Sequence, residues 1–171
     1  DDAIDYDEGY RGKNQFVFVY QKEGEGDRGG EHDGGTDPED GNPYATPVFA
    51  NVTSVSSGKV GKRCITFRDN AGGEYHNSIF LDFDRGIDIE FLASGESSYK
   101  RFAEGKLKVE NNIFINTAGD DTDAIFKVGT VEGKEPVQDE LDAANAAVKS
   151  YFVSAGNTVG GADITRSNVI P

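Results

Sequence analysis

The sequence predicts an all-β fold, and within that class a parallel β-helix, a solenoid of stacked coils. Three observations predict it. Short runs rich in β-forming residues are bounded by Gly, Asn and Asp, which is typical of strands joined by tight turns. Most of these runs have no helical segment between them, which excludes a doubly wound α/β sheet. Similar segments also recur along the chain, which is typical of a solenoid.

The expected strands follow one another at short intervals. They cover 3–7, 15–20, 47–55, 64–68, 78–83, 86–91, 107–110, 112–116 and 124–128. Strands this short also permit an antiparallel β-sandwich, which is the alternative fold.

One repeat is seen in two similar tetrapeptides. Asn77-Ser78-Ile79-Phe80 and Asn111-Asn112-Ile113-Phe114 lie 34 residues apart. Asn tolerates the left-handed backbone that sharp corners require, and stacked Asn side chains can form a hydrogen-bonded ladder. We therefore expect an Asn ladder at one corner and a buried stack of Phe80 on Phe114.

A second repeat is seen in the spacing of apolar strands. Strands that begin near Ile65, Ile87, Val109 and Ile125 are separated by 22, 22 and 16 residues. A single coil cannot bury its inner face, so stacked neighbours must supply the core, in about four to six incomplete coils. This spacing predicts that Ile65, Ile87 and Val109 lie in one buried column.

Two segments depart from the strand pattern. The segment 22–46 is rich in Gly and acidic residues and poor in apolar ones, so we expect a long loop that projects from the solenoid. The segment 136–155 predicts a helix with Pro136 in its first turn and Gly156 after its end. Its expected apolar stripe is Leu141, Ala144, Val148 and Tyr151 or Phe152.

Composition excludes several function classes. The chain of 171 residues has 17 Lys and Arg against 31 Asp and Glu, a net charge of −14, which argues against binding nucleic-acid backbones or anionic membranes. Its one cysteine, Cys64, excludes an intrachain disulfide and is expected to be a buried apolar residue. No apolar run is long enough to span a membrane. The absence of Met predicts a processed chain or a fragment.

Three segments carry a resemblance to known proteins. The run 68–80 (RDNAGGEYHNSIF) resembles the coils of right-handed parallel β-helix proteins of the pectate-lyase-like superfamily. The segments 1–12 and 29–34 are similar to parts of large secreted bacterial surface proteins, several of which are exported by type IX secretion. The resemblance covers roughly 1–170. It implies a right-handed helix, a secreted or outer-surface location, and the C-terminal coils of a longer solenoid. The narrower similarity to surface proteins implies no activity.

Clustered carboxylates suggest calcium binding, because calcium takes six to eight oxygen ligands. No segment has the EF-hand spacing or the nonapeptide repeat of calcium β-rolls, and a solvated acidic loop is the alternative interpretation. The candidate ligands are Asp1, Asp2, Asp5, Asp7, Glu31, Asp33 and Asp37.

A charged patch on the outer wall is the candidate catalytic or carbohydrate-binding site. Alternation along the strands places Arg68, Asp88, Glu90 and Lys108 outward on neighbouring coils. Pectate-lyase-like enzymes use wall carboxylates to hold calcium and a basic residue to take a proton, and the resemblance implies similar roles for such a patch. Opposite charges on neighbouring strands can instead pair only for stability.

The sequence favours a non-catalytic structural and binding module over an enzyme. The expected role is an acidic scaffold in an extracellular assembly that holds calcium or glycan, formed by a single domain over 1–171. The expected partners are other subunits, preceding coils of the same chain, or extracellular polysaccharide. The alternative is a polysaccharide lyase or glycoside hydrolase that acts on the wall.

Overall fold

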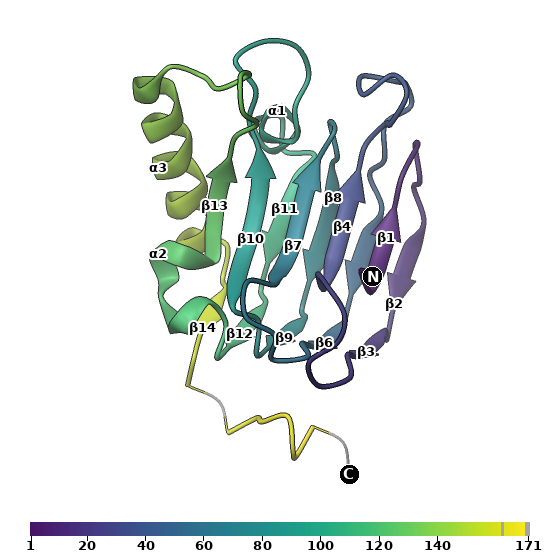
Figure 1. Cartoon of the computed structure of the whole chain (residues 1–171), viewed down its shortest axis with the longest axis vertical. Coiled ribbons are helices and arrows are strands. Elements are labelled where there is room, and N and C mark those ends of the chain that lie inside the picture. Colours follow the sequence, from purple (N-terminus) through teal and green to yellow (C-terminus); the bar gives the residue numbers. More distant parts are fainter. Residues whose placement is uncertain (162, 170–171) are drawn as a thin grey trace.

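The computed structural model describes residues 1–161 and 163–169, and it is a right-handed parallel β-helix with three sheets (Figure 1). All strand pairs in this part of the chain are parallel. Sheet A contains β1 (Ile4–Tyr6), β4 (Gly30–Asp33), β7 (Arg63–Arg68), β10 (Arg85–Glu90) and β13 (Phe126–Gly129). Sheet B contains β2 (Lys13–Gln15), β5 (Val48–Ala50), β8 (Gly73–His76) and β11 (Leu107–Glu110). Sheet C contains β3 (Phe18–Tyr20), β6 (Thr53–Val55), β9 (Ile79–Leu81), β12 (Ile113–Ile115) and β14 (Thr158–Val159).

The chain visits sheets A, B and C in turn, and each visit to all three makes one coil. The first four coils are complete. A short helix, α1 (Ser98–Ala103), is inserted in the fourth coil, and η1 (Ala118–Asp120) and α2 (Thr122–Ile125) precede β13. In the fifth coil the helix α3 (Gln138–Ser154) takes the place of a strand in sheet B.

The helix expected over 136–155 is confirmed as α3. Its buried side chains are Ala144, Val148 and Phe152, the stripe that the sequence predicted, with Leu141 and Tyr151 packed beside them. The chain leaves the helix through Gly156, whose φ of +74° favours glycine.

Helix α3 also covers the last strands of sheets A and B. Val128 N in β13 donates to Asn145 Oδ1 at 3.0 Å, and Val109 N in β11 donates to the Tyr151 hydroxyl at 3.0 Å. Side chains of the helix therefore satisfy backbone groups that a further strand would otherwise pair.

The predicted core columns are partly confirmed. Ile65 lies opposite Ile87 in sheet A, and Phe80 lies opposite Phe114 in sheet C with ring centroids 5.1 Å apart. The placement of Val109 was wrong: it is buried, but it lies in sheet B opposite Tyr75. The 22-residue interval after Ile87 ends on the next sheet rather than on the next coil, because α1 lengthens the connection between β10 and β11.

The Asn ladder expected at one corner is present only in part. A ladder of hydrogen bonds follows the corner between sheets B and C, but only its last two members, Asn112 and Asn157, are Asn. Asn51, Asn77 and Asn111 occupy the left-handed corner position of successive coils, with φ of +56°, +51° and +56°. At the next position, Asn112 Oδ1 accepts from Ser78 N at 2.9 Å, and Ser78 Oγ in turn accepts from the backbone N–H of the coil before.

The sequence predicted that segment 22–46 is a single projecting loop, and this prediction was wrong. The segment contains β4, which pairs with β1 and β7, and His32 in β4 is completely buried. Its glycines allow close packing: a Cβ on Gly34 would lie 2.2 Å from Asn70 O, and one on Gly29 would lie 2.6 Å from Cys64 O. At Gly29 and Gly34, glycine therefore permits close contact between coils. Cys64 is buried as expected.

The outer face of sheet C is apolar and is covered by the C-terminal segment. Val55, Leu81 and Ile115 form a buried cluster, against which Ile164 and Val169 pack. The segment runs back from the last coil past β9 and β6 toward β3 (Figure 1). Within the described part of the chain, no helix has the length and apolar character needed to cross a membrane.

Candidate functional site on the outer face of sheet A

The outer face of sheet A holds three of the four predicted wall residues. Arg68, Asp88 and Glu90 project from β7 and β10, which are adjacent strands of this sheet. Lys108 lies elsewhere, because β11 belongs to sheet B, and its Nζ is 3.2 Å from Glu74 Oε1. The expectation of one contiguous patch of four residues was therefore wrong, for the same reason that Val109 lies outside the Ile65 column.

Arg68 is held between two carboxylates of the preceding coil. Its Nη1 lies 3.0 Å from Glu31 Oε1, and its Nε donates to Asp33 Oδ1 at 2.7 Å. Glu31 and Asp33 alternate with buried His32 along β4, so both carboxylates point outward. The strand register thus places Arg68 beside the acidic residues of β4.

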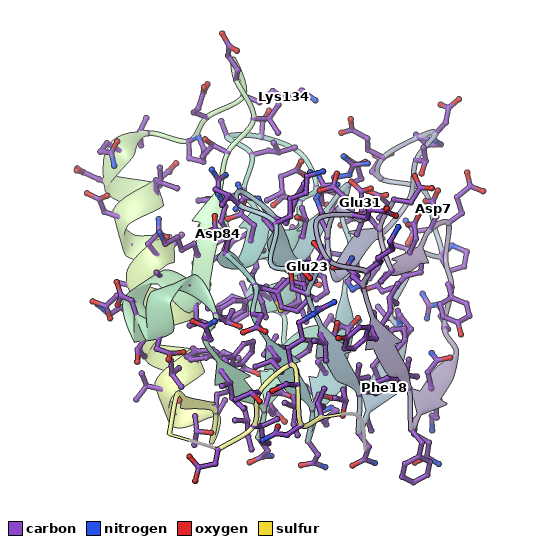
Figure 2. All side chains as sticks on the ribbon, turned by 60° about the horizontal axis from the view of Figure 1, so that its bottom comes forward. Asp7, Phe18, Glu23, Glu31, Asp84 and Lys134 are labelled. Carbon is purple, nitrogen blue, oxygen red and sulfur yellow. The ribbon has the colours of Figure 1, made fainter. Side chains whose placement is uncertain are left out.

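A second arginine extends this ion-pair network to the first coil. Arg28 Nη1 lies 3.0 Å from Glu31 Oε1 and 3.5 Å from Asp2 Oδ2. Burial and the neighbouring Asp2 carboxyl raise the pKa of Glu31 to about 7, although Arg28 and Arg68 act in the opposite direction. Figure 2 shows Glu31 on the same side of the molecule as Asp7, which belongs to the first coil.

Two further carboxyl groups gather beyond Arg68. The backbone N–H of Asp69 donates to Glu90 Oε1 at 3.3 Å. Burial, followed by the nearby charge of Asp69, raises the pKa of Glu90 to about 7, and burial next to Asp33 raises the pKa of Asp69 to about 6. Carboxyl groups with such raised pKa values can hold a proton near neutral pH, which is the property of a general acid.

Asp88 has a different environment. Its Oδ2 lies 3.0 Å from Arg63 Nη1. Burial raises the pKa of Asp88, although Arg63, Lys127 and Arg85 lower it. This carboxylate is therefore partnered by a cation rather than by a second carboxylate.

The predicted calcium ligands do not converge on one point. Asp2, Glu31 and Asp33 face arginines, and Asp7 Oδ1 accepts from Thr36 Oγ1. Asp5 lies on the same outer face, in register with Glu31, and its pKa is raised by burial and neighbouring carboxylates. The remaining two are Asp1 and Asp37. Among the described residues, no group of three His, Cys, Asp or Glu side chains is arranged to hold a metal, so calcium binding stays a prediction.

Sequence reasoning missed Arg63 and Asp69 as residues of this wall. It did predict that Glu31, Asp33 or Asp37 would face either a metal or basic groups such as Arg11 and Arg28 if the segment 22–46 is ordered, and Arg28 does pair with Glu31. Arg28 and Arg63 precede the strands β4 and β7, and Asp69 follows β7. The available signal was the alternation in Gly30-Glu31-His32-Asp33, which is typical of a strand and would have placed Glu31 and Asp33 on the wall.

Comparison with known proteins supports the architecture and adds no activity. Neither the curated proteins nor the solved structures include a match to this chain. The family model described as a pectate-lyase like beta helix domain matches residues 1–161. The chain therefore belongs to the family of pectate-lyase-like β-helix domains.

Proposed function

We propose that this chain is a non-catalytic structural and binding module, an acidic β-helix scaffold in a secreted or cell-surface assembly. The observation that carries the proposal is the contrast between its two ends. Helix α3 covers the last strands of sheets A and B, whereas β1, β2 and β3 are each the outermost strand of a sheet. Such edges present backbone groups that can pair with another strand.

The open end of the first coil also exposes apolar core. A cavity of about 510 Å³ is lined there by Ile4, Tyr6, Val17 and Phe49. Asn14 lies at its wall, and the buried Asn14 Nδ2 has no hydrogen-bond partner among the described residues. An added coil would cover the apolar side chains and could supply an acceptor for this amide.

Exposed aromatic residues border the same end. Phe16 is 78% exposed and Phe18 is 53% exposed. Phe16 occupies the left-handed corner position with φ of +59°, where later coils have Asn. A strained, exposed aromatic side chain is costly for an isolated domain, which supports contact with a partner at this end.

The partner proposed for this end is another β-helix coil, supplied by the same polypeptide or by a partner subunit. Only a coil presents three parallel strands to β1, β2 and β3 at once. The strand register defines how it would join: Ile4 is equivalent to Gly30 and Ile65, so Asp2 is equivalent to Arg28 and Arg63.

Addition of a coil tests this proposal directly. A copy of residues 28–62 placed before Asp2 continues the register, and it should raise the melting temperature, add β-sheet signal and reduce binding of a hydrophobic dye. An unstructured extension of equal length is the control. An added copy that stays unfolded, or that changes stability no more than the control, would contradict the proposal.

A polysaccharide lyase or glycoside hydrolase is the second candidate. It is favoured by the wall carboxyls of Glu31 and Glu90, whose pKa values are about 7. Acidic polysaccharides should be incubated with the protein, with and without calcium, and with Asp88→Ala and Glu90→Gln. Cleavage that is lost in these variants would establish the enzyme and overturn the non-catalytic proposal.

Calcium needs a separate test, because binding can occur without catalysis. A ligand that binds only the folded state must raise the melting midpoint as its concentration increases. Millimolar calcium should therefore raise the midpoint, and chelator should reverse the effect. Equal midpoints under both conditions would remove calcium from the proposed role.

A further inference from the structure

A second part of the sheet A wall contains a cavity lined by cations. It lies over the last three coils, has a volume of about 490 Å³, and is bordered by Arg63, Arg85 and Lys127. Ala124 and Leu141, from α2 and α3, contribute apolar walls. Asp84 also lines this cavity, and Figure 2 shows that Asp84 lies closer to α3 than Glu31 does.

The cations outnumber the acids that could neutralise them. Of the two acidic residues lining the cavity, Asp88 pairs with Arg63, and Asp84 Oδ2 accepts from Gly61 N at 2.7 Å. Among residues 1–161 and 163–169, neither Arg85 nor Lys127 has an ion-pair partner within 4.0 Å. Two cations without partners at one cavity are unusual in a chain whose net charge is −14.

Strand register explains why these charges converge. Arg85 lies opposite Arg63 at the start of β10 and β7, and Lys127 lies opposite Asp88 on β13 and β10. All three cations line the same cavity, and all three lower the pKa of Asp88. Like charges on adjacent strands repel, so an anion between them would relieve that repulsion.

We propose that this cavity binds the oxyanion group of a small ligand, a carboxylate, sulfate or phosphate, through Arg85 and Lys127. A guanidinium can bind an oxyanion with two parallel hydrogen bonds, and an ammonium adds a compact charge. The cavity has the size of a small-molecule site, and its apolar side formed by Ala124 and Leu141 can contact the uncharged part of the ligand. The paired Arg63 and Asp88 form a fixed polar border.

The acidic remainder of the protein does not prevent such binding. At physiological ionic strength, charges more than about 8 Å away are largely screened. Anion affinity is then governed by the nearby cations. This inference does not rest on the open end of the first coil, so each can fail without the other.

Titration of three separate probes tests the site. Inorganic phosphate, inorganic sulfate and acetate should each be added to the intact protein while backbone and side-chain NMR signals are recorded. We expect saturable shifts at Arg85 and Lys127. The order of affinities identifies the preferred chemistry: acetate as the tightest probe indicates a carboxylate, whereas phosphate or sulfate indicates the corresponding ester.

Charge-neutral variants provide the decisive comparison. Arg85→Gln and Lys127→Gln alter exposed side chains, so the fold should be retained, and together they should weaken the best probe by about tenfold or more. Lys106→Gln removes an equivalent exposed charge outside the cavity and is the control. Equal weakening by the control, or no saturable binding of any probe at millimolar concentration, would overturn the proposal.

Discussion

Asn112 Nδ2 in the fourth coil donates to Asn157 Oδ1 in the fifth coil at 3.2 Å. The same Asn112 amide donates to Tyr75 O at 3.0 Å and accepts from Ser78 N at 2.9 Å. One buried side chain thus links three successive coils through hydrogen bonds.

Asn112→Ala should destabilise the protein. It leaves buried donors and acceptors without partners, which we expect to lower the free energy of unfolding by about 3 kcal/mol. Urea unfolding measures the change. Thr158→Ala, at an exposed position of β14, is the control and should change stability by less than about 0.5 kcal/mol. A similar effect of both substitutions would contradict the role of the ladder.

Phe16→Asn should stabilise the isolated protein. Phe16 has φ of +59° and an exposed side chain, and Asn adopts this conformation at less cost, so we expect a gain of about 1 kcal/mol. The reciprocal change, Asn51→Phe, puts the same strain at the equivalent corner of the next coil and should destabilise. Thermal unfolding of both variants checks the pair, and a loss of stability in Phe16→Asn would show that the Phe16 side chain contributes more than its strain costs.

His32 should remain uncharged in the folded protein under mildly acidic conditions. It is stacked on Tyr6 with ring centroids 4.0 Å apart, its Nε2 lies 2.8 Å from the Tyr75 hydroxyl, and burial lowers its pKa from 6.5 to about 3. NMR of the imidazole nitrogens should show the neutral ring at pH 5. A charged ring at that pH would contradict the prediction.

The same shift predicts an effect of His32 on acid stability. Between the two pKa values the unfolded chain binds a proton that the folded chain excludes. His32 therefore removes stability as the pH falls from 6.5 toward 3, by up to about 1.4 kcal/mol for each pH unit. Urea unfolding at pH 7 and pH 5 should show a smaller acid loss in His32→Gln than in the unaltered protein.

Glu90 should have the opposite pH dependence. Its folded pKa of about 7 lies above the ordinary value of 4.5, so the folded state binds the extra proton and stability falls as the pH rises through this range. Glu90→Gln mimics the protonated carboxyl. We therefore compare the melting temperature of Glu90→Gln with that of the unaltered protein at each pH. The difference should favour the variant more at pH 8 than at pH 5. Glu132→Gln, at an exposed position, should show no such difference, and a pH-independent effect of Glu90→Gln would contradict the assignment.

Local patterns were sufficient for the features that depend on neighbouring residues in the chain. Helix α3 follows from its apolar stripe and flanking Pro and Gly, and the left-handed Asn corners follow from the repeated tetrapeptides. Strand β4 was missed because its segment is rich in glycine, as a mobile loop is. The sequence does not reveal which glycines are there to allow close approach of two coils.

The repeats were sufficient to align Ile65 with Ile87 and Phe80 with Phe114, but register across irregular connections could not be predicted. The inserted helix α1 moved Val109 and Lys108 to another sheet, although their inward and outward directions were correctly expected. The ion pairs of Arg68 depend on the alignment of β7 with β4, and no spacing in the sequence reveals that alignment before β4 itself is recognised.

The C-terminal segment changes how such a solenoid should lose its structure. Coils of a solenoid contact only their neighbours, so an unbraced one can fray gradually from either end. Here Arg166 donates to Ser56 O and, at 2.6 Å, to Gln21 O, and its guanidinium lies 4.1 Å from the centre of the Tyr20 ring. Residues that follow the last coil are therefore fastened to the first two. The last residues of the solenoid therefore contact its first coils as well as its last one. Loosening at one end should weaken the contacts at the other, so we expect the coils to unfold together rather than one after another.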